Sequence, residues 1–423
     1  MVPSVLVRRK TTKELSPLCQ ILVSFCFNIN IFISREKENF RMNIGIIGVG
    51  KLGLSYALVF EEVGYNVIAS SYKQEYVEQL QHKQIDTVEP GVESRLHASK
   101  NIEFTTDNHH VISECEYIYV MVATPSNPDG TYDVSAVEKV ADDLLLHPDD
   151  VSNKKLIIGC TTNPGDTAKI QEKLNRRSVK VIYSPTFVAQ GNVIDKIHNP
   201  DGTLIGTLHT QEAEACKKIF RLIQKNNAPF TVVQSTTAEI LKITFNCLMT
   251  LRISFNNQIG KLVIESGMEE DLDAVNFAMD TYDRNMKFSF GYGYGGPCLP
   301  RDNIAMTQYA KSIGSEYVFG EIVDHYNNDH SEFLAQWFIK NNPNNLPYYF
   351  DYITYKPGVN LTDTSQQYEF CKKLLDAGHV VYINPSDFLP EQFIAELAVY
   401  DTVAYQTKEE LEENNIDFCN IDL

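Results

Sequence analysis

The residues with the clearest chemical potential lie in the stretch Gly291 to Asp302, which reads GYGYGGPCLPRD. Four glycines within six residues let backbone approach a ligand closely, and Pro300 suits the first turn of a helix. Cys298 would then lie just before a helix N-terminus and beside Arg301, and both features favour thiolate over thiol. We therefore expect a depressed pKa for Cys298 and a role as nucleophile. The alternative is a packed, inert cysteine in a turn.

A second glycine-rich stretch, GVGKLG, follows a short apolar run near the start of the chain. In a strand–turn–helix unit the first glycine permits a tight turn, the second lets backbone approach a pyrophosphate, and the third lets helix pack on strand. The helix N-terminus then faces the phosphates. This context predicts a dinucleotide-binding loop rather than a merely tight turn. Its residues are Gly48, Gly50, Lys51, Leu52 and Gly53.

The acidic residue that usually holds the adenosine ribose, about 20 residues beyond such a loop, is missing here. The corresponding segment runs from Ser70 through Ser71 and Tyr72 to Lys73, and the first carboxylate is Glu75. Discrimination against a 2′-phosphate is weaker without that carboxylate, and two hydroxyls with a lysine can even accept one. The residues therefore leave NADP open as an alternative to NAD, with Ser71 at the ribose.

These groups must be positioned by an α/β framework. From Met42 onward, short apolar runs alternate with helical stretches, which predicts βαβ units around parallel sheets. Strands are expected at 44–48, 67–70, 117–122, 156–159 and 181–183 in a first doubly wound sheet, and at 348–354 and 380–383, joined by a helix at 366–377, in a second.

A single helix is expected between 236 and 268, with a length of about 45 Å. Thr236 and Glu239 are a candidate capping box at its start, and Gly267 lies near its end. Apolar residues occupy so much of its circumference that more than one face must be buried. We expect it to bridge two domains and to form a homodimer. Lys242 and Asn246 lie four residues apart on it and hence on one face, which is more often a solvated face than a site.

Composition limits the possible partners. The net charge is −18, and residues 1–41 hold seven Lys/Arg against three Asp/Glu, so the remaining body carries −22. Such a body repels a phosphate backbone, which argues against nucleic acid. The nine cysteines are scattered without a C-x-x-C pair, which indicates a reducing, cytoplasmic location and no metal site.

The first 41 residues combine a basic stretch with an apolar run from Cys19 to Ile33. The run is interrupted by polar residues, is short for a membrane span, and is not followed by a small-residue cleavage site. We interpret it as a non-globular extension or upstream start, with a targeting or anchoring segment as the alternative. No membrane association is expected of residues 42–423.

The cysteine stretch resembles the G-x-G-x-G-G-x-C-x-P-[KR]-D signature of UDP-glucose, GDP-mannose and UDP-N-acetylmannosamine dehydrogenases. Further motifs follow in the order of that family. They are Glu89-Pro90-Gly91, Thr124-Pro125 with Asp129-Gly130 and Asp133, Cys160 to Gly165, and Tyr355-Lys356-Pro357. The resemblance covers Met42 to the C-terminus. It implies two Rossmann-like doubly wound domains joined by the long central helix and a helical middle domain.

The expected domains are an extension at 1–41, a dinucleotide-binding domain at 42–235, a central dimerisation domain with the cysteine loop at 236–330, and a nucleotide-sugar-binding domain at 331–423. The resemblance implies NAD as cofactor and a UDP- or GDP-sugar as substrate. Catalytic roles fall to Cys298, Lys242, Asn246, Asp302 and Thr124. Cofactor contacts are expected from the glycine loop with Ser71, Thr124, Thr161 and Arg301. Substrate contacts are expected from Phe187, Val188, Gln190, Lys242, Asn246, Tyr292, Gly295 and Lys356.

The reaction implied by the resemblance oxidises a primary alcohol of the sugar to a carboxylate, through a thiohemiacetal and a thioester on Cys298. Lys242 would stabilise negative charge on oxygen, and Asn246 would orient the reacting group. Asp302, with Lys242 and an ordered water, would handle proton transfer.

The sequence departs from the family at the segment N-P-E-F-L-x-E-G, where Thr186 and Gln190 replace the two glutamates. A family arginine after Y-K-P is absent, and Arg284 only loosely matches another. We favour a working dehydrogenase. The alternatives are an enzyme that stops after one oxidation or releases thioester slowly, and a non-catalytic homologue that binds nucleotide sugar or dinucleotide. A 3-hydroxyacid or 6-phosphogluconate-type dehydrogenase would share the glycine loop and the long helix but would not need the cysteine loop.

Overall fold

The N-terminal domain is an α/β sandwich around one large sheet. The computed structural model describes residues 42–188, 191–282, 290–315, 319–359, 361–385 and 391–421. The strands are β1 (Asn43–Ile47), β2 (Asn66–Ser70), β3 (Ile102–Thr105), β4 (Tyr117–Val120), β5 (Lys155–Ile158), β6 (Lys180–Tyr183), β7 (Thr203–Gly206) and β8 (Phe230–Val233). The helices are α2 (Lys51–Glu62), α3 (Gln74–Gln81), α4 (Val92–Ala98), α5 (Asn108–Glu114), α6 (Ser135–Leu146), α7 (Asp166–Leu174), α8 (Val193–His198) and α9 (Thr210–Ile223), with a 3₁₀ turn, η2 (Asn175–Arg177).

The sheet has the order β3-β2-β1-β4-β5-β6-β7-β8. Neighbouring strands are parallel except for β6 and β7, which meet antiparallel. Apolar clusters cover both faces of the sheet, so strands such as β4 read as continuous apolar runs rather than alternating ones. The five strands expected in this domain are confirmed, each to within one or two residues at its ends.

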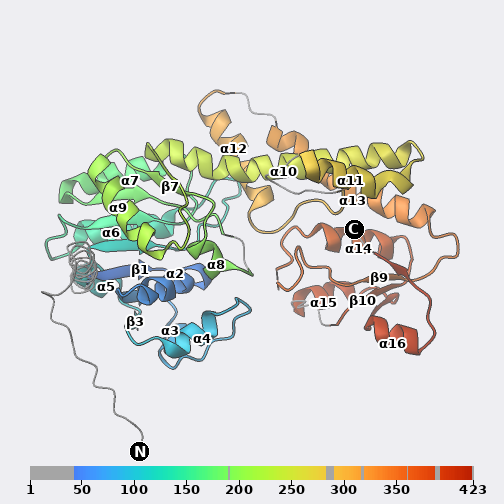
Figure 1. The fold of residues 1–423 in the computed structure, drawn as a ribbon, viewed down its shortest axis with the longest axis horizontal. Helices are drawn as coiled ribbons and strands as arrows, with labels where there is room; N and C mark the ends of the chain where they lie inside the picture. The colour runs from blue at the N-terminus through green and yellow to red at the C-terminus, as the bar shows by residue number, and fades with distance from the viewer. Residues whose placement is uncertain are drawn as a thin grey trace, which may run out of the picture.

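The central domain is built on α10 (Ser235–Glu265), which runs across both lobes of the molecule (Figure 1). Packed with it are η3 (Glu269–Asp271), α11 (Leu272–Tyr282), α12 (Leu299–Ser312) and α13 (Phe319–Lys340). The long helix is confirmed, with its start one residue earlier than expected. The buried face of α10 carries several small and polar residues, among them Ala238, Thr250, Ser254 and Gly260.

The expected capping box at the start of α10 is wrong. The N-cap is Gln234, and no side chain caps the helix. Glu239 is fully buried and instead accepts hydrogen bonds from the backbone N–H groups of Gly165 (2.6 Å) and Thr167 (2.9 Å) at the start of α7. The hydroxyls of Thr162 (2.8 Å) and Thr167 (2.6 Å) donate to the same carboxylate. Burial raises the pKa of Glu239, and these donors oppose that rise. A carboxylate that caps the N-terminus of one helix from another thus ties the central helix to the first domain.

The C-terminal domain is a smaller parallel sheet with flanking helices. Its strands follow the order β11-β10-β9-β12, and all neighbouring pairs are parallel. The elements are β9 (Tyr348–Phe350), α14 (Gln366–Asp376), β10 (Val381–Ile383), α15 (Glu391–Leu397), β11 (Val403–Tyr405), α16 (Lys408–Glu413) and β12 (Cys419–Asn420). Together with the N-terminal domain, it confirms the expected architecture of two Rossmann-like units joined by a long helix (Figure 1).

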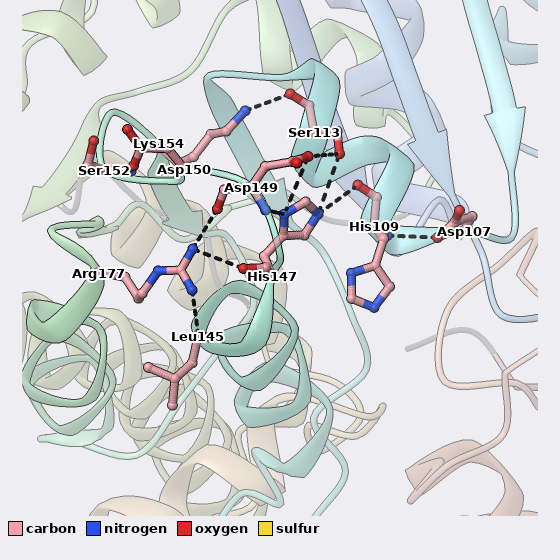
Figure 2. A network of polar contacts seen from close by, with 10 residues as sticks. All are labelled: Asp107, His109, Ser113, Leu145, His147, Asp149, Asp150, Ser152, Lys154 and Arg177. Carbon is pink, nitrogen blue, oxygen red and sulfur yellow. Dashed lines mark hydrogen bonds and ion pairs between the residues drawn. The ribbon is translucent and has the colours of Figure 1, made fainter.

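A polar network fixes α5 against the loop that follows α6 (Figure 2). The backbone N–H of Asp149 donates to Nδ1 of His147 (3.2 Å). The Asp149 carboxylate accepts from Ser113 (3.1 Å), and its Oδ2 lies 3.8 Å from Nδ1 of His147, beyond hydrogen-bond distance. The Arg177 guanidinium donates to the carbonyls of His147 (2.9 Å) and Asp149 (2.5 Å). Although a serine, a histidine and an aspartate meet here, the imidazole nitrogen facing Asp149 accepts a backbone hydrogen bond. The serine therefore lacks the imidazole–carboxylate arrangement of a catalytic triad, and the network holds the fold together.

Candidate active site at the junction of three domains

The glycine loop between β1 and α2 has the geometry of a dinucleotide site. Gly48 has a φ of +99°, and a Cβ there would lie 2.7 Å from the Met121 backbone. A Cβ on Gly53 would lie 2.3 Å from the Gly48 carbonyl, whereas one on Gly50 would meet no atom within 4 Å. The first and third glycines are therefore needed for packing, and the second leaves open space where a pyrophosphate approaches. No side chain caps α2, so its N–H groups remain available to an anion.

A cavity of about 1260 Å³ lies beyond this loop. Lys51 lines it at the phosphate end, Ser71 and Lys73 line it at the end of β2, and Lys139 lines it from α6. The backbone N–H of Lys73 donates to the Ser71 hydroxyl (3.4 Å). The loop and cavity fit a nicotinamide dinucleotide, and the ribose end carries a hydroxyl and a lysine where a carboxylate was absent from the sequence.

The cysteine loop is held by amide side chains from two helices of the central domain. Asn257 on α10 accepts from the N–H of Gly291 (3.0 Å) and donates to the carbonyl of Tyr292 (3.2 Å). Asn327 on α13 makes the same pair of bonds with Tyr294, to its N–H (2.8 Å) and its carbonyl (2.9 Å). Each amide thus replaces the strand partner that this irregular backbone lacks. These hydrogen bonds therefore fix the backbone of the loop that leads to Cys298.

The end of the loop touches the C-terminal domain. The N–H of Gly296 donates to the carbonyl of Asp363 (2.8 Å), and the Thr364 hydroxyl donates to the carbonyl of Gly296 (3.2 Å). A Cβ on Gly295 would lie 2.4 Å from the Thr364 carbonyl, and one on Gly296 would lie 2.7 Å from the Tyr355 ring. Thr364 itself has a φ of +50°, a strained conformation for a β-branched residue. These contacts explain why the two adjacent positions are glycine.

Cys298 is the N-cap of α12, as expected, and among the seven cysteines in the described part of the chain only it is exposed. The expected depression of its pKa is wrong. Although the residue reaches solvent, the protein around the sulfur raises the pKa of the thiol. The Asp302 carboxylate adds to the rise, while the Arg301 and Lys242 cations act in the opposite direction. The thiol is therefore held near two cations but is not a ready thiolate in this state.

Lys242 and Asn246 on α10 face the start of α12. Asn246 donates to Oδ2 of Asp302 (2.7 Å), and the Lys242 ammonium lies 4.7 Å from the centre of the Phe187 ring. Burial lowers the pKa of Lys242, and the Asp302 and Cys298 charges oppose that change. Burial also raises the pKa of Asp302, whose side chain is 1% exposed. The structure thus brings together the lysine, asparagine, aspartate and cysteine that the sequence singled out.

Arg301 joins this group to the first domain. Its guanidinium donates to the Thr124 carbonyl (3.1 Å) just beyond β4, and lies 4.8 Å from the centre of the Tyr132 ring. Thr124 is buried and enters the site through this carbonyl. Thr161 is half-buried beyond the end of β5 and stays a predicted cofactor residue.

Tyr132 was missed by sequence reasoning. Its hydroxyl donates a short hydrogen bond to Oδ1 of Asp302, and its ring is 2% exposed. Asn163 brackets its backbone, accepting from its N–H (2.8 Å) and donating to its carbonyl (2.9 Å). The only signal in the sequence is its position next to the motif residue Asp133. The sequence does not show that the residue beside the motif points inward.

The predicted substrate residues fall into three groups. Phe187 and Val188 line a separate, largely apolar cavity of about 690 Å³ beside α10. The Tyr292 ring packs against Tyr352 and Phe370 of the C-terminal domain. The Lys356 ammonium lies 3.8 Å from where a Cβ on Gly191 would be, so it reaches across to the first domain. Gln190 and Arg284 lie outside the described residues.

The family motif residue Glu89 also has a structural role. Its carboxylate accepts from the N–H groups of Gly191 (2.6 Å) and Val193 (3.3 Å) and is buried. Within the described ranges, no group of three His, Cys, Asp or Glu side chains is arranged to hold a metal ion. In the same part of the chain, no helix combines the length and apolar character needed to cross a membrane.

Comparison with known families decides what this arrangement belongs to. Residues 42–224 match the NAD binding domain of the UDP-glucose/GDP-mannose dehydrogenase family, and residues 236–329 match the central domain of the same family. The chain belongs to the UDP-glucose/GDP-mannose dehydrogenase family. The nucleotide-sugar dehydrogenase resemblance of the cysteine loop is therefore confirmed at the level of the family.

Individual relatives are distant. The chain is 25% identical to the putative UDP-glucose 6-dehydrogenase YtcA of Bacillus subtilis over 370 residues, which cover 83% of each chain. It is 28% identical over 283 residues to the uncharacterized protein MJ1054 of Methanocaldococcus jannaschii, covering 64% of this chain but only 31% of that protein's length. A UDP-glucose dehydrogenase from Pyrobaculum islandicum has the same fold, with a TM-score of 0.75, 21% identity and 90% coverage of each chain.

The electrostatics of Cys298 can be tested by alkylation. Arg301→Gln removes a cation that opposes the effect of burial, so the thiol pKa should rise further. We expect alkylation of Cys298 by iodoacetamide, below that pKa, to slow by roughly tenfold, since the thiolate is the reacting form. Mass spectrometry of the Cys298 peptide measures the rate. The exposed Lys311, which pairs with Glu321 (2.8 Å), supplies the control Lys311→Gln with an unchanged rate. Equal rates in Arg301→Gln and the unmodified protein would contradict this account.

Proposed function

We propose that this chain oxidises the primary alcohol of a UDP- or GDP-linked sugar to a carboxylate, with a nicotinamide dinucleotide as hydride acceptor. The observation that carries the proposal is the exposed Cys298 at the N-terminus of α12, with charges from Lys242 and Arg301 acting on its sulfur. A nucleophile beside an oxyanion-stabilising ammonium is what covalent capture of an aldehyde needs. The dinucleotide loop and cavity supply the second requirement.

The proposed chemistry proceeds in three stages. The alcohol carbon loses a hydride to the dinucleotide and its hydroxyl loses a proton, which gives an aldehyde. The Cys298 sulfur adds to the aldehyde carbon as thiolate, and the Lys242 ammonium stabilises the oxyanion of the resulting thiohemiacetal. Loss of a second hydride from that carbon, to a second dinucleotide, gives a thioester. Water then cleaves the carbon–sulfur bond and restores the thiol. The raised thiol pKa is compatible with this order, because the Lys242 and Arg301 charges lower that pKa and so favour the thiolate.

Thioester hydrolysis is the step at which this chain departs from the family pattern. Thr186 replaces a family glutamate and lies beyond β6, where its N–H donates to the Gly159 carbonyl (3.4 Å). A threonine hydroxyl is no base near neutral pH. A second candidate function is therefore an enzyme that accumulates the thioester, and a third is a binding protein for nucleotide sugar or dinucleotide.

Cofactor stoichiometry separates these functions. The full chain is incubated with dinucleotide and a panel of UDP- and GDP-sugars, and reduced cofactor is followed by absorbance. We expect two equivalents of reduced cofactor per sugar. A burst of two equivalents per enzyme followed by arrest indicates thioester accumulation, and one equivalent per sugar indicates arrest at the aldehyde level. Ligand binding without any reduction would refute the dehydrogenase.

Two variants complete that test. Cys298→Ala should abolish acid formation, because the aldehyde can no longer be captured, and full acid production by this variant would sink the covalent mechanism. Thr186→Glu should speed thioester release by at least about tenfold if the missing base limits turnover, within the range of general-base effects. Cys419→Ala, a half-buried cysteine of the C-terminal domain, serves as the control and should keep full activity.

The NAD binding domain of the family supports NAD as the cofactor. The ribose end of the cavity in this chain presents Ser71 and Lys73, which favours acceptance of NADP as well. The first carboxylate after β2 that lines this cavity is Glu75, four residues beyond Ser71. An exposed free thiol also suits a reducing compartment such as the cytoplasm.

Cofactor preference follows from this geometry. We expect kcat/KM with NADP to lie within about tenfold of that with NAD. Ser71→Asp should lower kcat/KM for NADP by at least about tenfold, because like charges repel, and should leave NAD use intact. Ser71→Ala is the neutral control. Failure of the unmodified enzyme to use NADP while it uses NAD would overturn the preference.

We further propose that the chain forms a homodimer through α10. Its exposed apolar residues recur at helical spacing and form a single stripe, with exposed fractions between 40% and 56%. They are Leu241, Phe245, Leu248, Phe255 and Leu262. A stripe of this kind on a long helix suits packing against a second copy of the same helix. Leu241 and Phe245 also line the apolar cavity beside Phe187, so a partner would cover that opening.

Disruption of the stripe should separate the subunits. We expect the unmodified chain to have twice its 48.0 kDa mass by light scattering after gel filtration. Phe255→Glu with Leu262→Glu buries two charges in the contact and should shift the mass to that of one chain. Val399→Glu, at a residue 76% exposed in the C-terminal domain, should remain dimeric. A monomeric unmodified chain would rule out the contact.

A further inference from the structure

A small hairpin of the N-terminal domain docks directly onto the helix that carries the nucleophile. Ser126 and Tyr132 form an antiparallel bridge, and the N–H of Asn127 donates to the Thr131 carbonyl (2.8 Å). At the tip, Gly130 has a φ of +85°, and a Cβ there would lie 2.1 Å from Ile304 on α12. The hairpin therefore needs a glycine at the point where it presses against α12.

The hairpin ends in the buried phenol of Tyr132, which meets the Asp302 carboxylate. The two side chains are 2% and 1% exposed, and the phenol donates to Oδ1. Asn246 donates to Oδ2 (2.7 Å), so each carboxylate oxygen has a protein donor. Arg301 lies over the Tyr132 ring and 3.9 Å from Oδ1. A carboxylate held on both oxygens is suited to fixing its neighbours and is less suited to taking a proton from an ordered water.

We propose that Tyr132 is a positioning residue of this site: its phenol, together with Asn246, holds Asp302 as the ionised counter-ion of Lys242. The proposal rests on the proposed function of Lys242 as the oxyanion-stabilising cation. A lysine in such crowded surroundings keeps its proton only if an anion stands nearby. Tyr132 therefore acts on the reaction through Asp302 and touches no reacting atom.

The charged and hydrogen-bonding groups around the Asp302 carboxylate come from three parts of the chain. Lys242 faces it from α10, Arg301 from its own helix α12, and Tyr132 from the hairpin. Cys298 lies near enough for the Asp302 charge to raise its pKa, and Tyr183 lies near enough to Tyr132 to raise the pKa of that phenol. Burial raises the pKa of Asp302, whereas the phenol, the two cations and Asn246 lower it. Loss of the phenol should therefore raise this pKa further.

The direct test is Tyr132→Phe, which keeps the ring beneath Arg301 and removes only the hydroxyl. The acid limb of kcat/KM should move to higher pH by about one unit, as expected when a charge-stabilising hydrogen bond to a carboxylate is lost. Tyr368→Phe is the matched control, since its phenol donates to Glu396 (2.7 Å) in the C-terminal domain. It should leave the acid limb in place. An unmoved acid limb in Tyr132→Phe would overturn the proposal.

A second measurement is independent of turnover and separates this proposal from the proposed function. A carboxyl whose folded pKa is raised contributes stability at low pH and loses it as pH rises through that pKa. Because Tyr132→Phe raises the folded pKa of Asp302 further, its melting temperature should fall below that of the unmodified chain more at about pH 8 than at about pH 4, near the pKa of an unfolded aspartate. A deficit that is the same at both pH values would show a role in packing alone and refute the counter-ion role. If no nucleotide sugar is oxidised, the proposed function fails while this measurement still decides the state of Asp302.

Tyr132→Gln guards against a variant that loses its fold through the aromatic ring. It removes the ring but retains a donor that can reach the carboxylate. We expect a lower melting temperature with the acid limb near its original position. A shift of the acid limb equal to that of Tyr132→Phe would show that the ring, rather than the donated hydrogen bond, matters.

Discussion

One buried carboxylate, Asp302, constrains the whole candidate site. It lies in the first turn of α12, almost without solvent contact, and takes its donors from α10 and from the hairpin after β4. A carboxylate in such surroundings is costly unless it is hydrogen-bonded and paired. The chain meets this requirement by bringing Tyr132, Asn246 and the Lys242 charge to the same place. That convergence also fixes the start of α12, where Cys298 stands.

A second buried carboxylate has a related role at the other side of the central helix. Glu239 caps α7 from α10, so two parts of the first domain, the 162–167 turn and the 126–132 hairpin, are tied to the central domain by acidic groups. Asn163 links these two attachments, because its side chain brackets the Tyr132 backbone. The N-terminal and central domains therefore share one polar framework, and the lysine and asparagine of α10 are placed by it.

Much of this could be read from the sequence because the signals were local. The glycine loop, the apolar strands and the long helix each depend on residues within a few positions, so their spacing was sufficient. Cys298 at the start of a helix followed from Pro300 and the preceding glycines. Lys242 and Asn246 shared a face because helical geometry requires it.

What could not be read depended on long-range packing. Thr236 and Glu239 have the spacing of a capping box, but Glu239 instead accepts a hydrogen bond at the start of a different helix, 74 residues earlier in the chain. The helix dipole and Arg301 are the local signals for the pKa of Cys298, but the loss of water around its sulfur, although the residue reaches solvent, decides the direction of the shift. Tyr132 lies 170 residues from Asp302, and no local pattern indicates such a pairing.

The hydrogen bond between the Gly296 N–H and the Asp363 carbonyl attaches the C-terminal domain to the backbone two residues before Cys298. The hydrogen bond from Arg301 to the Thr124 carbonyl attaches the N-terminal domain to α12, three residues after Cys298. Any hinge motion between the two lobes must therefore strain or break one of these two hydrogen bonds. In this structure both contacts are present, so the position of the Cys298 sulfur is set by the two lobes together.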